Sequence, residues 1–192
     1  MESTKHLKMN IPNFITLLRI ILVPAFVIFL IQAEYDKALV VFVAAGLTDA
    51  LDGTLARLLK CQTILGAYLD PIADKLLLVT SYATLAILGI IPAWLAVLVI
   101  SRDFIILMGI AILALMSIPC EIKPAMVSKI TTALQISTIF FPLLYKAVQH
   151  DIGYHWIVGL FWLTALFTVI SGLVYIIRGI RILNQSSPEG GK

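Results

Sequence analysis

The sequence predicts an all-α integral membrane protein with six transmembrane helices. Of its 192 residues, 60% are hydrophobic and only 13% are charged, and the mean hydropathy is +1.02. A soluble domain carries roughly a quarter charged residues, so this composition excludes a soluble globular enzyme and a disordered chain. The net charge of +3 comes without a long basic run, which argues against a nucleic-acid partner. Cys61 and Cys120 form no disulfide or metal-binding pattern.

The predicted spans are apolar runs of the length that a helix needs to cross a bilayer, about 20 residues. Short polar or turn-forming segments separate them. The first run contains Arg19 and lacks a convincing cleavage site, so we interpret it as a retained helix and not as a signal peptide. The six spans are Ile11–Ile31, Ala38–Leu59, Leu69–Gly89, Ile91–Met116, Ala125–Ala147 and Ile157–Ile177.

The distribution of lysine and arginine predicts the orientation of these spans, because cytoplasmic loops are enriched in both residues. With an even number of spans, both termini lie on one side. That side holds Lys5, Lys8, Arg57, Lys60, Lys123, Lys129, Arg178, Arg181 and Lys192, whereas the opposite loops hold Lys37 and Lys146. We expect one membrane domain over residues 1–192 in a bacterial inner membrane. Residues 1–10 form a short cytoplasmic N-terminus and residues 185–192 a flexible tail.

Four aspartates gather near the predicted cytoplasmic ends of the second and third spans. Asp49 and Asp52 are three residues apart and Asp70 and Asp74 are four apart, so each pair shares a helix face. The short loop between the spans makes them antiparallel neighbours, which lets the pairs converge. Carboxylates so close cannot all stay ionised unless cations join them. Their hard oxygen ligands suit Mg²⁺, Mn²⁺ or Ca²⁺ better than zinc.

Small residues and one arginine accompany the aspartates. Gly53 and Ala56 leave room for close approach of a ligand or another helix, and Arg57 can reach an anion held by the cations. Glycine alone indicates only helix packing, and one buried aspartate–arginine pair is often structural. Four aspartates without a matching number of cations do not fit that explanation. The combination indicates a site for a diphosphate.

These residues resemble the complete signature of the CDP-alcohol phosphotransferases. The matching pattern is Asp49-x-x-Asp52-Gly53-x-x-Ala56-Arg57, eight residues, then Gly66-x-x-x-Asp70-x-x-x-Asp74. The similarity extends over nearly the whole chain. The opening segment with Asn13 and Arg19, and the stretch from Leu69 to Lys75, look like the phosphatidylglycerophosphate synthase and cardiolipin synthase branch.

The resemblance implies a six-helix bundle, usually a homodimer, with an active site open to the cytoplasm. Members of the family displace CMP from a CDP-linked lipid with an alcohol. By resemblance, the metal ligands are Asp49, Asp52, Asp70 and Asp74, they hold Mg²⁺ or Mn²⁺ (two ions), and Asp74 is also the general base. The residues implied to bind the CDP-lipid are Asn13, Arg19, Gly53, Ala56, Arg57 and Gly66.

The chemistry of the motif is consistent with that reaction. A carboxylate within hydrogen-bond reach can take the proton of the acceptor hydroxyl, and Asp74 lies one turn from Asp70. The motif contains no serine, cysteine or histidine as an obvious nucleophile. We therefore expect direct displacement without a covalent enzyme intermediate.

The acceptor alcohol is predicted from three further cations, Arg102, Lys123 and Lys129, which could form a phosphate pocket. The alternative is structural: Asp103 could pair with Arg102, and the lysines could extend toward lipid headgroups. Glycerol 3-phosphate would give phosphatidylglycerophosphate, and phosphatidylglycerol would give cardiolipin.

The usual pattern for the first acceptor has Arg-Glu followed by a second arginine, whereas this chain has Arg102-Asp103 and then Ile110. The segment from Lys123 to Gln135 resembles the cardiolipin synthase side. We nevertheless predict CDP-diacylglycerol and glycerol 3-phosphate as substrates, because the opening motif resembles that of the bacterial phosphatidylglycerophosphate synthases. Cardiolipin synthesis from phosphatidylglycerol is the alternative. A divalent-cation transporter is disfavoured, because the charges gather at one end of two helices and no inverted repeat with broken helices is present.

Overall fold

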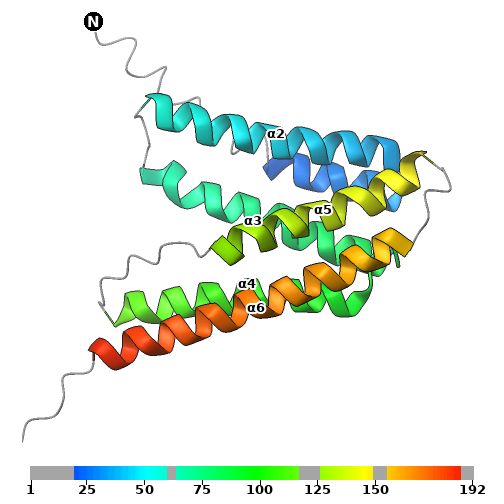
Figure 1. The fold of residues 1–192 in the computed structure, drawn as a ribbon. Helices are drawn as coiled ribbons and strands as arrows, with labels where there is room; N and C mark the ends of the chain where they lie inside the picture. Colours follow the sequence, from blue (N-terminus) through cyan, green and yellow to red (C-terminus); the bar gives the residue numbers. More distant parts are fainter. Residues whose placement is uncertain (1–19, 60–63, 117–125, 149–154, 187–192) are drawn as a thin grey trace, which may run out of the picture. The chain divides into compact units, whose positions relative to one another are not determined.

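The computed structural model describes residues 20–59, 64–116, 126–148 and 155–186, and over residues 49–59 and 64–74 it describes the backbone without the side chains. All regular structure in these ranges is helical (Figure 1). A short apolar helix, Ile20–Ile31, comes first. The helices that follow are α2 (Tyr35–Leu59), α3 (Ile64–Ile87), α4 (Ala93–Leu115), α5 (Met126–Val148) and α6 (His155–Ser186).

The all-helical fold class is confirmed for the described residues, and three of the helices are long and apolar enough to cross a membrane. The three stretches are Ala93–Leu113, Met126–Val148 and His155–Ile182. Helix α3 begins before the predicted start at Leu69. Helix α6 continues to Ser186 and so includes the first two residues of the predicted tail. An apolar run marks only the part of a helix that suits lipid, and a helix can continue into the interface with arginines on its surface.

Two tight turns end with a residue in the left-handed backbone conformation. Gly89 (φ 68°) follows α3, and the amide of Ile90 donates to the carbonyl of Leu85 at 2.9 Å. Ala33 (φ 58°) adopts the same conformation before α2, where the amide of Glu34 donates to the carbonyl of Phe29 at 2.9 Å. These bonds satisfy carbonyl groups that would otherwise have no partner at the helix end. Both turns lie in the short segments that the sequence places between predicted spans.

The chain forms two compact units, which we describe separately. The first comprises Met1–Ile91 and Ile139–Ile152. The rings of Phe26 and Phe42 lie 5.7 Å apart and join the first helix to α2. Tyr82 on α3 is fully buried. This packing supports the ends of α2 and α3 that lie away from the aspartates.

The second unit comprises Pro92–Thr138 and Gly153–Lys192, and in it α4 and α6 lie side by side (Figure 1). The rings of Trp94 and Trp162 are 5.1 Å apart near the start of both helices. Further along, Arg102 of α4 bonds to Ser171 of α6. Because both pairings advance in the same direction, α4 and α6 are parallel.

Helix α5 is antiparallel to α6. The hydroxyl oxygens of Thr138 and Thr164 are 2.6 Å apart, whereas Thr131 donates to the carbonyl of Phe167 at 3.1 Å, so a lower number on α5 pairs with a higher one on α6. Pro142 lies inside α5 and has no amide hydrogen to donate to the carbonyl of Thr138. The boundary between the two units falls at this turn of α5.

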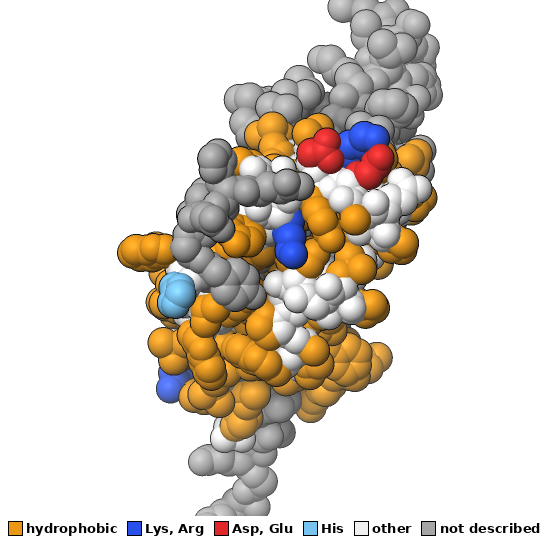
Figure 2. All heavy atoms as spheres, turned by 90° about the vertical axis from the view of Figure 1, so that its right-hand side faces the viewer, with side chains coloured by type: hydrophobic (Ala, Val, Ile, Leu, Met, Phe, Trp, Pro, Cys, Tyr) orange, Lys and Arg blue, Asp and Glu red, His pale blue; other side chains and the backbone are white. Residues whose placement is uncertain are grey.

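Large hydrophobic side chains cover much of the outer surface (Figure 2). On α4 and α6 they include Val97, 64% exposed, and Trp162, 65% exposed. In water such exposure would favour aggregation, but it suits helices whose outer faces contact lipid. The surface therefore agrees with the three stretches that are long enough to span a membrane.

We expect the Thr138–Thr164 contact to stabilise the second unit, because a hydroxyl in an apolar bundle gains from a partner on the neighbouring helix. A double-mutant cycle with Thr138→Val and Thr164→Val should give a coupling free energy of about 0.6 kcal/mol, measured by unfolding in detergent. Ser137→Ala is the control, since among the described residues Ser137 donates to the carbonyl of Ala133 in its own helix. A coupling energy of zero would contradict a stabilising role.

Candidate active site

Helix α2 carries the first half of the signature. Asp49, Asp52, Gly53 and Ala56 occupy positions i, i+3, i+4 and i+7 of one continuous helix, which places them on a single face. Arg57 follows on the next position. The segment from Asp49 to Arg57 rises about 12 Å along the helix axis. The backbone of this segment is therefore helical, as a shared face for Asp49 and Asp52 requires.

Helix α3 carries the second half. Gly66, Asp70 and Asp74 recur every four residues within the helix, so they also share one face. The side chains of both halves lie outside the described residues. Among the side chains that are described, no group of three His, Cys, Asp or Glu could hold a metal ion. The four signature aspartates could hold such an ion, since all of them offer hard oxygen ligands.

Asn13, Arg19 and Lys123 also lie outside the described residues. Lys129 is exposed near the start of α5. Gln135, a further polar residue of the same helix, is fully buried. Of the two predicted acceptor cations that the structure describes, Arg102 is buried and Lys129 is not.

Arg102 is 5% exposed and Asp103 is 3% exposed. The Arg102 Nη1 donates to Asp103 Oδ1 at 2.7 Å, although neighbouring residues on a helix usually face different ways. The ion pair anticipated as the structural alternative is thus present. The pair contributes little net stability, because much of the attraction within a buried pair only offsets the cost of removing both charges from water.

The second terminal nitrogen of Arg102 connects three helices. Nη2 donates to Ser128 Oγ of α5 and to Ser171 Oγ of α6, each at 2.7 Å. The guanidinium carbon lies 5.8 Å from the ring centre of Tyr175, a cation–π distance. Arg102 Nε is buried without a hydrogen-bond partner among the described residues. One donor of the group therefore stays available for a further acceptor.

Sequence reasoning missed Ser171 and Tyr175, although a signal was present. Thr164, Thr168 and Ser171 occupy positions i, i+4 and i+7 of α6, and all three are buried. Thr131, Gln135 and Thr138 repeat that spacing on α5. Polar stripes on two apolar helices indicate faces that meet each other or a buried charge.

Comparison with known proteins adds independent information. The family model for CDP-alcohol phosphatidyltransferase matches residues 9–172, which include the whole signature in α2 and α3. A Bacillus subtilis protein named CDP-diacylglycerol–glycerol-3-phosphate 3-phosphatidyltransferase is 31% identical over 93% of this chain and 99% of its own length. A Mycobacterium tuberculosis protein named probable phosphatidylglycerophosphate synthase is 34% identical over 90% of this chain and 82% of its own length.

A third relative carries the other name of this branch. The Drosophila melanogaster protein named probable cardiolipin synthase (CMP-forming) is 30% identical over 88% of this chain, and the match spans 58% of that relative. The predicted resemblance to the phosphatidylglycerophosphate synthase and cardiolipin synthase branch is thus confirmed by both sets of names. Because the family model matches residues 9–172, the chain belongs to the CDP-alcohol phosphatidyltransferase family.

Proposed function

We propose that this protein transfers a phosphatidyl group from CDP-diacylglycerol to glycerol 3-phosphate, forming phosphatidylglycerophosphate and releasing CMP. The observation that carries the proposal is the unbroken signature, whose two halves each fall on one face of a helix, the first on α2 and the second on α3. The Bacillus subtilis relative supports the acceptor, because its match covers nearly its whole length. The human cardiolipin synthase (CMP-forming), 34% identical over 66% of this chain, supports phosphatidylglycerol as the alternative acceptor.

The donor lipid would bind at the signature. Members of the family depend on metal ions, and the ligands we propose for two ions of Mg²⁺ or Mn²⁺ are Asp49, Asp52, Asp70 and Asp74. Bound metal ions neutralise charge on the diphosphate and so make its phosphorus open to attack. Gly53, Ala56, Arg57 and Gly66, together with Asn13 and Arg19, would hold the cytidine diphosphate portion.

In the reaction, the acceptor hydroxyl attacks the phosphorus that bears the diacylglycerol. Asp74 would take the proton from that hydroxyl as the new phosphorus–oxygen bond forms. The bond from this phosphorus to the bridging oxygen then breaks, and CMP leaves with the electron pair. Arg57 would stabilise negative charge on the departing phosphate. The displacement is direct, so no lipid is attached to the protein at any stage.

The acceptor phosphate would bind near Arg102, Lys123 and Lys129. Support comes from the buried position of Arg102 and from its remaining Nε donor. Ser128 and Ser171 hold the guanidinium group from two other helices. In the proposed assembly the chain is one domain of six spans in a bacterial inner membrane. The termini and active site face the cytoplasm, and the protein forms a homodimer.

The acceptor can be identified with purified protein in detergent. CMP release from CDP-diacylglycerol should require glycerol 3-phosphate, and phosphatidylglycerophosphate should appear in equal amount. Phosphatidylglycerol as the only effective acceptor would contradict our assignment and establish the alternative. Metal flux into liposomes without CMP release from any alcohol would instead indicate a transporter.

Chelation should abolish CMP release, and Mg²⁺ or Mn²⁺ should restore it.

Asp74→Asn keeps the size of the side chain and removes its basicity, so kcat should fall by about 10² to 10⁴-fold. Asp36→Asn, in the first turn of the same helix as Asp49, is the matched control and should leave kcat unchanged. Full activity of Asp74→Asn would contradict its role as the base.

Arg102→Lys separates acceptor binding from a purely structural role. Lysine keeps the charge but cannot reproduce the planar fork that contacts Asp103, Ser128 and Ser171. We expect the KM for glycerol 3-phosphate to rise about tenfold while the KM for CDP-diacylglycerol stays constant. Lys146→Gln is the charge control. A lower Tm with an unchanged acceptor KM would show that Arg102 serves only the fold.

A further inference from the structure

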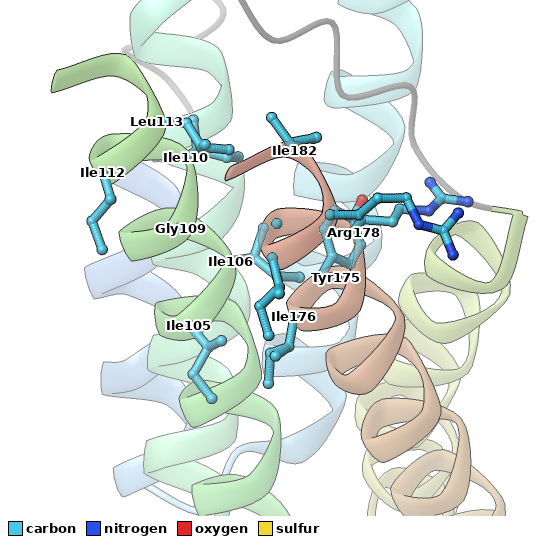
Figure 3. Close-up of a pocket in the computed structure, with 13 residues that line it drawn as sticks. Ile105, Ile106, Gly109, Ile110, Ile112, Leu113, Tyr175, Ile176, Arg178 and Ile182 are labelled. Carbon is cyan, nitrogen blue, oxygen red and sulfur yellow. The ribbon is translucent and has the colours of Figure 1, made fainter. Parts of the chain in front are cut away.

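A pocket of about 420 Å³ lies between α4 and α6 in the second unit, near the end of both helices (Figure 3). Isoleucines of both helices line it, including Ile106 and Ile110 of α4 and Ile176 and Ile180 of α6. The remaining lining residues are leucine, glycine, tyrosine and arginine. Its volume is within the range of pockets that hold small organic ligands.

Two glycines, one from each helix, make the pocket hollow. A Cβ atom built on Gly109 or Gly179 would meet nothing within 4 Å, whereas one on Gly172 would come within 3.7 Å of Arg102. The space is thus left by the absence of side chains where the helices could carry them. An apolar hollow in a bilayer gains dispersion contacts when a hydrocarbon chain enters it.

The polar edge of the pocket carries positive charge. Arg178 and Arg181 lie three residues apart on α6, and both are exposed. Figure 3 shows the Arg178 side chain extending sideways from α6, with its guanidinium group beyond the isoleucine side chains. All lining residues that carry a formal charge are arginines. Basic side chains at the end of a membrane helix attract lipids with anionic headgroups.

We propose that this pocket holds one acyl chain of an anionic phospholipid of the surrounding bilayer, with the lipid phosphate bound by Arg178 and Arg181. Charge complementarity selects the headgroup, since an arginine fork pairs well with a phosphate. The apolar walls accept the chain. Tyr175 lines the pocket and also contacts Arg102, so the bound lipid packs against the ring that lies beside the guanidinium group of Arg102.

This site is separate from the catalytic proposal and requires no turnover. The test is native mass spectrometry of the full chain, equilibrated in detergent with equal amounts of phosphatidylserine and phosphatidylcholine. Phosphatidylserine is anionic and is neither donor nor acceptor in the reactions considered above. We expect the protein to retain phosphatidylserine with a preference of roughly tenfold, and the preference to decrease with added salt.

Two double variants test separately the contribution of the arginine charges and that of the apolar space. Arg178→Gln with Arg181→Gln should remove the preference for phosphatidylserine while some lipid is still retained. Gly109→Leu with Gly179→Leu should reduce retention of both lipids, because the new side chains occupy the space of the acyl chain. Circular dichroism and size-exclusion chromatography show whether each variant folds, and the exposed arginines make the first pair the safer one.

The matched controls lie outside the pocket. Gly159→Leu adds the same side chain to α6 where a Cβ also meets nothing within 4 Å, and Lys146→Gln removes a charge from α5. Both controls, and Asp74→Asn, should bind lipid as the unaltered chain does. Equal retention of the two lipids by the unaltered chain would overturn the proposal. Retention of neither lipid would overturn it as well.

Discussion

The interior of a membrane offers no water to a charged side chain, and this constraint shapes the second unit of the protein. Arg102 is buried on a helix whose other residues are mostly apolar. It stays charged at acceptable cost because Asp103, Ser128 and Ser171 accept its hydrogen bonds. These partners come from three helices, so the solvation of one guanidinium group sets the register of α4, α5 and α6.

The same register accounts for neighbouring features of the unit. Parallel α4 and α6 bring Trp94 beside Trp162 at one end and leave the isoleucine-lined pocket at the other. Threonines on α5 and α6 extend the polar contact away from Arg102, as Thr138 and Thr164 show. Small and hydroxyl-bearing residues let membrane helices approach closely where apolar burial alone supplies no preference for one partner.

The charges of the signature in α2 and α3 are balanced differently. Its aspartates have no equal number of cations nearby in the sequence, and the metal ions that we propose would balance their charge. The Arg102–Asp103 pair instead balances its own charge. The two sets of charges can therefore be distinguished by composition: the pair is locally neutral, whereas the signature is acidic, as the metal site that we propose requires.

Much of the architecture is predictable from the sequence, because apolar length and helical spacing are local properties. The helical state of α2 and α3, the shared faces of Asp49 with Asp52 and of Asp70 with Asp74, and the family all follow from the order of residues. Helix ends are predicted less well, as Ile64 and Ser186 show, since hydropathy reports lipid contact and not the hydrogen bonds that end a helix.

The sequence by itself determined that the chain is a helical membrane protein with an acidic signature. Only the tertiary structure decided that Arg102 bonds to Ser128 and Ser171, and that Gly109 and Gly179 leave a hollow between parallel helices. The physical reason is that helical spacing assigns a residue to a face of its own helix. Which faces meet depends on packing between segments far apart in the chain.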